Sequence, residues 1–265
     1  MGRLTAYLLR NFRAWDMSSR FALIAAFVLM LVTLLALLFG PQNLRQPALI
    51  GFVGLIFVMQ IIFMWGSRGM VTAYTQAQRA YLAEDFDKAR HILETLSVNG
   101  KSDVRSLTLL GNTYRQLGML DESEEVLTKA LELRPLDHFP LYGIGRTLLV
   151  KGQYAQAADK IKQALDAGAP PIIQLDLGEA LYRIEQLDQA RLALRAVKDV
   201  SQEPHRVLMS QYLLYCLGDN SPPTGELVAL GLPYWQDNAL RFRNTPYGQI
   251  LAEDVQRMQA FTEER

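Results

Sequence analysis

The feature that most constrains the fold is a set of residue columns that recur every 33 or 34 positions between residues 70 and 202. Each column keeps one kind of residue, either small or apolar, in a single register. Such a period is typical of two-helix units stacked along one axis, whereas a general antiparallel helical bundle keeps the helices without the fixed spacing. The columns are Ala77, Gly111, Gly145 and Gly178; Ala89, Ser123, Ala157 and Ala190; Phe86, Leu120, Tyr154 and Leu187; and the shorter pair Ala130 and Ala164.

The columns have a simple physical reason. Two helices that pack closely need small residues where they cross, and each pair leaves an apolar face that the next pair covers. Gly118 and Gly152 are placed to end the first helix of a unit, since glycine adopts the left-handed backbone of a tight turn. Pro135 is placed to stop the second helix.

Residues 104–136 resemble the tetratricopeptide repeat, with its leucine-glycine and tyrosine in the first helix, its late alanine and its closing proline. Two positions depart from the pattern, because Ser123 replaces the small alanine and Leu127 replaces the aromatic residue. The resemblance implies an all-α solenoid that binds proteins or peptides. We expect about four repeats, at 70–103, 104–137, 138–170 and 171–202; the matching positions in the second are Leu110, Gly111, Tyr114, Ala130 and Pro135.

Residues 203–265 follow the repeats and do not continue the period. Glu203 and Pro204 begin a further helix that closes at Gly218, which we interpret as a capping helix. The proline-rich segment 221–248 predicts an irregular loop, and 249–264 predicts a final amphipathic helix. The aromatic residues Tyr234, Trp235 and Phe242 are expected to cover apolar surface of the last helices; a partner-binding epitope is the alternative.

Two apolar runs precede the repeats, at 21–39 and 48–65, and neither contains a charged residue. The first spans about 28 Å as a helix, close to the hydrocarbon thickness of a bilayer. We expect a transmembrane hairpin over 21–66, with residues 40–47 as the loop. A signal peptide is disfavoured because the first run is long and no small-residue cleavage site follows it. A buried soluble hairpin is the other alternative.

The distribution of arginines predicts the orientation of this hairpin. Both outer flanks carry more arginines than the loop, which contains only Arg45. The protein is therefore expected in the cell (inner) membrane, multi-pass, with both termini and the repeats in the cytoplasm. Residues 1–20 are a basic segment, read as an interfacial amphipathic helix or, alternatively, as an unstructured tail. The flanking arginines are Arg3, Arg10, Arg13 and Arg20 before the spans, and Arg68 and Arg79 after them.

Gln60 is the one strongly hydrogen-bonding side chain in the second apolar run. Its amide could bond within the hairpin or to the helix of a partner protein, and the sequence favours neither. Gly51 and Gly54 allow close helix packing without forming the four-residue small-residue dimer motif.

Composition excludes several function classes. The 27 basic and 27 acidic residues balance, which argues against a general nucleic-acid binder. No nucleophile motif, phosphate-binding glycine loop or metal-ligand spacing is present, so we predict no enzyme, no cofactor, no metal and no small-molecule substrate. His91, His138 and His205 are far apart in the register. Cys216 is the single cysteine; it excludes an internal disulfide and is expected to be a small buried residue.

The resemblance implies that the first helix of each repeat lines a concave binding face. Its tyrosines and arginines suit peptide recognition, because arginine can hold a carboxylate by two parallel hydrogen bonds. Thr108 and Tyr142 stand where chaperone-tail-binding members carry a basic residue, so that ligand is not predicted. The candidate partner-binding residues, about half of which we expect to be exposed, are Tyr74, Gln78, Tyr81, Arg105, Asn112, Arg115, Tyr142, Arg146, Glu179, Tyr182, Arg183 and Tyr212.

These expectations favour a membrane-anchored adaptor that binds protein partners in the groove and contacts the bilayer through residues 21–65. Two alternatives stay open. One is an assembly or biogenesis factor with its repeats outside, similar only in outline to the two-span factors of cytochrome c maturation. The other is an accessory subunit of a larger membrane complex, held through Gln60 and the hairpin. An enzyme is the least favoured interpretation.

Overall fold

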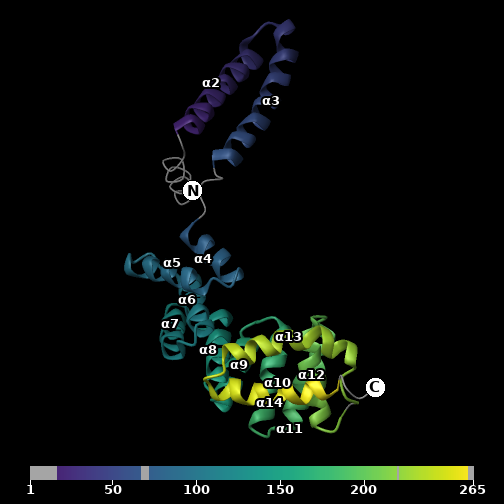
Figure 1. The fold of residues 1–265 in the computed structure, drawn as a ribbon. Coiled ribbons are helices and arrows are strands. Elements are labelled where there is room, and N and C mark those ends of the chain that lie inside the picture. Colours follow the sequence, from purple (N-terminus) through teal and green to yellow (C-terminus); the bar gives the residue numbers. More distant parts are fainter. Residues whose placement is uncertain (1–16, 67–71, 220, 262–265) are drawn as a thin grey trace. The chain divides into compact units, whose positions relative to one another are not determined.

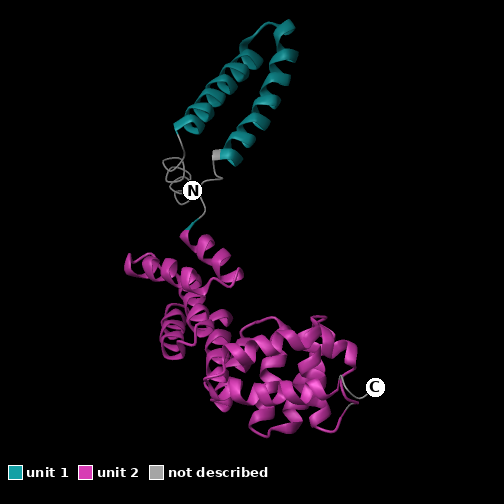
Figure 2. Cartoon of the chain, viewed as in Figure 1, with its two compact units in different colours: residues 1–72 teal, residues 73–265 magenta. Residues whose placement is uncertain are grey.

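The computed structural model describes residues 17–66, 72–219 and 221–261. Over these residues it contains helices and turns but no strand, which confirms the all-α fold (Figure 1). The chain forms two compact units, residues 1–72 and 73–265 (Figure 2). The expected interfacial helix at 1–20 lies mostly outside the described residues.

The first unit is a hairpin of two apolar helices, α2 (Met17–Phe39) and α3 (Gln42–Gly66) (Figure 1). Only Gly40 and Pro41 connect them, so the expected loop at 40–47 is wrong. The polar residues after Pro41 continue the helix, and Pro47 is accommodated inside it. The apolar run begins at residue 48, but the helix begins six residues earlier, at Gln42. The start of an apolar segment therefore need not be the start of a helix.

Both helices of the hairpin expose apolar side chains over nearly their whole length. Their hydropathies reach 3.0 and 2.4, and among their described residues only Ser19, Ala26 and Ala48 are buried. The helix of a soluble core would instead bury most of such residues. By length and composition, each helix is long and apolar enough to cross a bilayer.

The second unit is a succession of paired helices followed by one more helix (Figure 1). The two helices of each pair pack against each other, and the second helix of each of the first four pairs packs against the first helix of the next. The pairs are α4 (Ala73–Leu82) with α5 (Phe86–Val98), α6 (Val104–Gln116) with α7 (Leu120–Leu133), α8 (His138–Val150) with α9 (Tyr154–Asp166), α10 (Gln174–Arg183) with α11 (Leu187–Val200), and α12 (Pro204–Cys216) with α13 (Gly225–Arg241). A short 3-10 helix, Pro171–Ile173, precedes α10, and α14 (Pro246–Ala260) ends the unit.

The glycine column sets how closely the two helices of a pair approach. Each of these glycines faces a large aliphatic residue sixteen positions later. A Cβ at Gly145 would lie 2.6 Å from Ile161 Cγ1, and one at Gly178 would lie 2.7 Å from Leu194 Cγ. Both distances are too short for carbon atoms, so only glycine permits this packing.

Ser123, which replaces the usual alanine, is fully buried and bonded on both sides. Its hydroxyl donates to the Gly111 carbonyl at 2.7 Å and shares a 2.8 Å hydrogen bond with the Thr147 hydroxyl. Serine in place of alanine at this position therefore links α7 to α8 by a hydrogen bond, and its buried hydroxyl has hydrogen-bond partners.

The turns inside the pairs have the left-handed backbone that the glycines predict. Gly118 and Gly152 both have φ of +76°, and Gly218 has φ of +78°. Glu84 and Glu185 take the same place in the first and fourth pairs, with φ of 58° and 61°. Gly218 thus marks the turn of a fifth pair.

The predicted irregular segment at 221–248 is wrong, because residues 225–241 form the helix α13. Pro222 and Pro223 lie before the helix begins, so they do not interrupt its backbone hydrogen bonds. Thr224 caps the first turn by accepting a hydrogen bond from the Leu227 N–H. Pro233 lies inside α13, which nevertheless continues because it packs along α12. The final helix also begins earlier than predicted, at Pro246.

Trp235 and Phe242 are buried, which confirms the prediction for these two aromatic residues, whereas Tyr234 is exposed. The indole N–H of Trp235 donates to the His205 carbonyl at 2.7 Å. Cys216 was expected to be buried, but it is exposed. It is the last residue of α12, where the chain leaves the core through Gly218.

Candidate partner-binding groove

We call the surface formed by the first helices of the pairs the inner face, and most of its candidate residues are covered. Of the twelve candidate residues only Gln78 and Arg105 are exposed, while Arg115, Glu179 and Tyr212 are buried. The other seven are half-buried. The expectation that half would be exposed is therefore wrong, and the reason is the position of the C-terminal helices.

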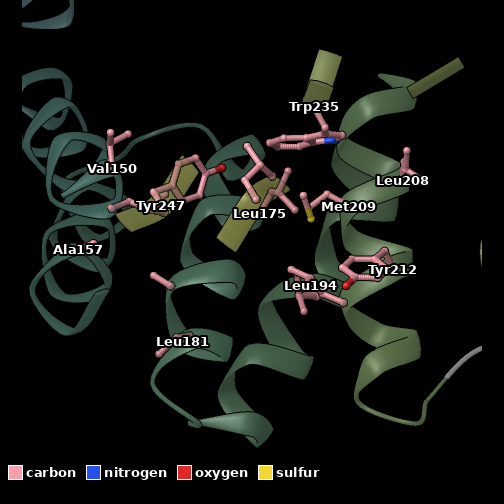
Figure 3. Close-up of a cluster of buried hydrophobic side chains, with 14 of the residues drawn as sticks. Val150, Ala157, Leu175, Leu181, Leu194, Leu208, Met209, Tyr212, Trp235 and Tyr247 are labelled. Carbon is pink, nitrogen blue, oxygen red and sulfur yellow. The ribbon is translucent and has the colours of Figure 1, made fainter. Parts of the chain in front are cut away.

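Helix α14 covers the inner face of the third, fourth and fifth pairs. Its Asp254 is buried, forms an ion pair with Arg183 of α10 and accepts a 2.7 Å hydrogen bond from the Tyr212 hydroxyl of α12. Tyr247 and Leu251 of α14 belong to the same hydrophobic core as the repeat helices. Figure 3 shows Tyr247 and Trp235 in the same cluster of buried side chains as Leu175, Leu208 and Met209.

The end of α13 extends this cover to the first two pairs. Arg241 forms an ion pair with Glu84 at 2.6 Å and donates to the Gln116 side chain at 3.0 Å. Its guanidinium carbon also lies 5.1 Å from the centre of the Phe86 ring. The last pair of helices is therefore tied to the first repeat, more than 150 residues earlier in the chain.

The covered part of the inner face contains a polar network between neighbouring repeats. Asp176 of α10 accepts from the Tyr142 hydroxyl at 2.6 Å and pairs with Arg146 at 2.5 Å, both from α8. Sequence reasoning missed Asp176, although it lies one period after Tyr142. Arg115 donates to Asn112 at 2.7 Å but forms no ion pair with any described carboxylate, and burial lowers its pKa.

Glu179 is the buried acid with the most unusual environment in this network. Burial raises its pKa from 4.5 to about 7, although Arg183, 3.4 Å away, opposes the shift. Because the folded-state pKa exceeds the unfolded one, the folded protein binds more protons between pH 4.5 and 7. Ionised Glu179 therefore destabilises the fold increasingly as the pH rises through this window, and the penalty is constant above it.

We expect Glu179→Gln to be more stable than wild type at pH 8, by at most on the order of 3 kcal/mol, and to lose this advantage near pH 5. Urea unfolding of both proteins at several pH values measures the difference. Glu185→Gln, at an exposed position of the same repeat, is the control and should show no such pH dependence. A difference for Glu179→Gln that does not vary with pH would contradict the argument.

One stretch of the inner face stays open, between α4, α6 and the start of α8. It is a groove of about 460 Å³ whose walls combine apolar and hydrogen-bonding side chains. Arg105 is exposed there and has no carboxylate within ion-pair distance among the described residues, whereas Arg134 pairs with Asp137 at 3.2 Å. The groove is lined by Tyr74, Gln78, Val104, Arg105, Thr108, Leu109, Asn112, Arg134, Asp137 and Phe139.

The structure thus divides the predicted site into two parts. Tyr74, Gln78, Arg105 and Asn112 line the open groove. The candidate residues from later repeats contact the C-terminal helices or one another. The extra lining residues Arg134 and Phe139 flank the junction between the second and third repeats, which is a weak signal of their position. Within the described part of the chain, no group of three metal-ligating side chains gathers at either place.

Comparisons with known proteins agree with the repeat geometry. The tetratricopeptide repeat family matches residues 104–135 and 142–204. None of the curated proteins compared with the chain is a significant match. Among solved structures, MamA (residues 41 to the end) from Desulfovibrio magneticus RS-1 is 19% identical, with a TM-score of 0.48, over 73% of this chain and 94% of that one.

A chain from the crystal structure of the APC/C hetero-tetramer Cut9–Hcn1 is 16% identical, with a TM-score of 0.52, over 87% of this chain. The match covers 46% of that protein, so our chain spans slightly less than half its length. At this identity the likeness to the Cut9–Hcn1 chain concerns the fold alone. The matches and the helix pairs built on them show that this chain contains tetratricopeptide repeats over residues 104–135 and 142–204.

Proposed function

We propose that this protein is a membrane-anchored scaffold that binds a segment of a partner protein in the open groove of its first two repeats. The observation that carries the proposal is the contrast between the two parts of the inner face. The later repeats are covered by α13 and α14, while none of the described residues fills the groove lined by Tyr74, Gln78 and Arg105.

The lining suits a short peptide segment. Tyr74, Leu109 and Phe139 offer apolar contact, and Gln78 and Asn112 offer amide groups that can bond to a peptide backbone. Arg105 supplies an exposed cation without a carboxylate partner among the described residues, which favours an acidic group on the ligand. The repeats thus support a general role as a protein-interaction scaffold, and the groove is the site where we place the partner.

The hairpin supports the anchoring part of the proposal. Helices of 23 and 25 residues are about 35 Å long, enough to cross a bilayer with some tilt. The arginines of the outer flanks favour a cytoplasmic repeat domain in the inner membrane. Anchoring raises the local concentration of the groove near other membrane proteins, so a modest affinity suffices.

The groove is tested by placing a photo-crosslinking amino acid at Gln78 in the full-length protein in its native membrane. The same amino acid at Gln156, an exposed glutamine on α9, is the matched control. We expect one defined adduct from the groove position and none from the control. Arg105→Glu should reduce the adduct at least about tenfold, by losing one charge-assisted hydrogen bond and adding a like charge. Equal labelling at both positions would contradict the proposal.

Anchoring and orientation need separate measurements. Wild-type protein should stay in the membrane after alkaline carbonate extraction. A reporter that is active only in the cytoplasm, fused after Arg265, should be active; a stable but inactive fusion would favour the biogenesis factor with external repeats. If carbonate released the wild-type protein, the anchoring part of the proposal would be contradicted, and only the scaffold role would remain.

A further inference from the structure

The sequence leaves two roles open for the Gln60 amide: a hydrogen bond within the hairpin, or one to the helix of a partner protein. The position of Gln60 on α3 distinguishes between them. The side of α3 that packs on α2 carries Ala48 and Gly51, and a Cβ at Gly51 would lie 3.6 Å from Thr33 Cγ2. Met59 is half-buried on this side, whereas the next residue, Gln60, is exposed. One residue step turns an α-helix by about 100°, so Gln60 points away from α2.

The amide of Gln60 makes no hydrogen bond to any residue that the structure describes. The structure therefore does not support a hydrogen bond between the Gln60 amide and the rest of the hairpin. The neighbouring residues on this side of α3 are exposed and apolar, and include Val53, Ile56 and Phe57. None of them has a side chain that can donate to or accept from an amide.

Gln60 also lies inside the apolar part of the helix. Trp65, which is exposed near the end of α3, is the kind of residue that settles at a membrane interface. Gln60 precedes it by five residues, which places the amide about 7 Å deeper along the helix. If lipid alone surrounded this position, two N–H donors and a carbonyl would lose their hydrogen bonds to water, which is strongly unfavourable.

We propose that this side of α3 is a contact with a second copy of the same protein, in which the two Gln60 amides bond to each other. The inference rests on the membrane anchoring proposed above. All copies enter the bilayer in one orientation, so a twofold axis along the membrane normal places each residue at the same depth as its counterpart. A carboxamide both donates and accepts, and is therefore complementary to itself.

The hairpin offers no equally good intramolecular solution. The Thr33 hydroxyl of α2 already donates to the Met30 carbonyl at 2.9 Å, and Thr33 faces Gly51 rather than Gln60. The surrounding apolar residues supply van der Waals packing to the contact, and the paired amides fix its register. The dimer interface thus consists of the Gln60 side of α3, with Val53, Ile56 and Phe57.

Disulfide crosslinking of the full-length protein in native membranes tests this contact. Gln60→Cys and Val58→Cys are each placed in a Cys216→Ser background, because Cys216 is exposed. Val58 is also exposed and lies at nearly the same depth, but on the opposite side of α3. We expect mild oxidation to give at least about five times more covalent dimer with Gln60→Cys.

Energy transfer between labelled copies in liposomes tests the amide itself. Gln60→Leu should raise the apparent dissociation constant of the dimer at least about tenfold, and Gln60→Asn, which keeps an amide, should raise it less. The inference is overturned by equal crosslinking from both cysteine positions, by an unchanged dissociation constant for Gln60→Leu, or by crosslinking of Gln60→Cys to a different protein.

Carbonate extraction separates the two levels of the argument. If the protein resists extraction but does not dimerise through Gln60, this inference fails and the proposed anchoring remains. If carbonate releases the wild-type protein, the anchoring fails, and the contact fails with it.

Discussion

Asp254→Ala is expected to lower the free energy of unfolding of the repeat domain by about 3 kcal/mol. The substitution removes the carboxylate that pairs with Arg183 and accepts from the Tyr212 hydroxyl. It leaves a guanidinium buried with only Glu179, at 3.4 Å, as a charged partner. A buried charge that loses the shorter of its two ion pairs costs far more than a surface charge that loses one.

Urea unfolding followed by circular dichroism measures this loss, and hydrogen exchange shows where it acts. Exchange should quicken most in α14, whose attachment depends on Asp254. Glu253→Ala is the matched control, since this neighbouring carboxylate is exposed and lies 3.7 Å from Arg257. The control should change stability by less than about 1 kcal/mol. Equal losses from the two substitutions would mean that Asp254 does not hold α14.

Gly145→Ala is expected to destabilise the same domain by about 2 to 3 kcal/mol, although alanine is intrinsically the better helix former. The added Cβ would lie 2.6 Å from Ile161 Cγ1 and 3.3 Å from the Ile161 backbone nitrogen. The side chain can move only partly, because Ile161 is fully buried, and the backbone cannot move without separating α8 from α9.

A double-mutant cycle identifies the cause of this loss. Ile161→Ala removes the Cγ1 atom, so Gly145→Ala should cost at least about 1 kcal/mol less in that background than in wild type. Thermal or urea unfolding of the four proteins gives the coupling energy. Additive effects would show that the Gly145 position does not set the distance between the helices.

The repeat array could be predicted because its information is local and periodic. A glycine or alanine sixteen residues before a buried aliphatic residue, as in Gly145 and Ile161, repeats in each of the four predicted repeats and needs no knowledge of distant contacts. The cover over the inner face could not be predicted in this way. It depends on Asp254 meeting Arg183, which lie 71 positions apart and outside any shared period.

The fifth helix pair was missed because of its prolines. Pro222 and Pro223 indicated a loop, and Pro233 argued against a helix, so α13 was not expected. Gly218 was the signal that could have corrected this, because it continues the turn positions of Gly118 and Gly152 and has the same backbone conformation. Packing against α12 outweighs the lost backbone hydrogen bond at Pro233.

The filled half of the inner face limits what this protein can recognise. A solenoid normally reads a long extended ligand along many units, and gains affinity with each unit added. Here α13 and α14 lie over the inner face beyond the second repeat, so the groove between α4, α6 and α8 would not continue along this face for a longer ligand. Under the proposed function, selectivity would come from a few residues of the ligand, and a long residence time would come from anchoring both proteins in the same membrane.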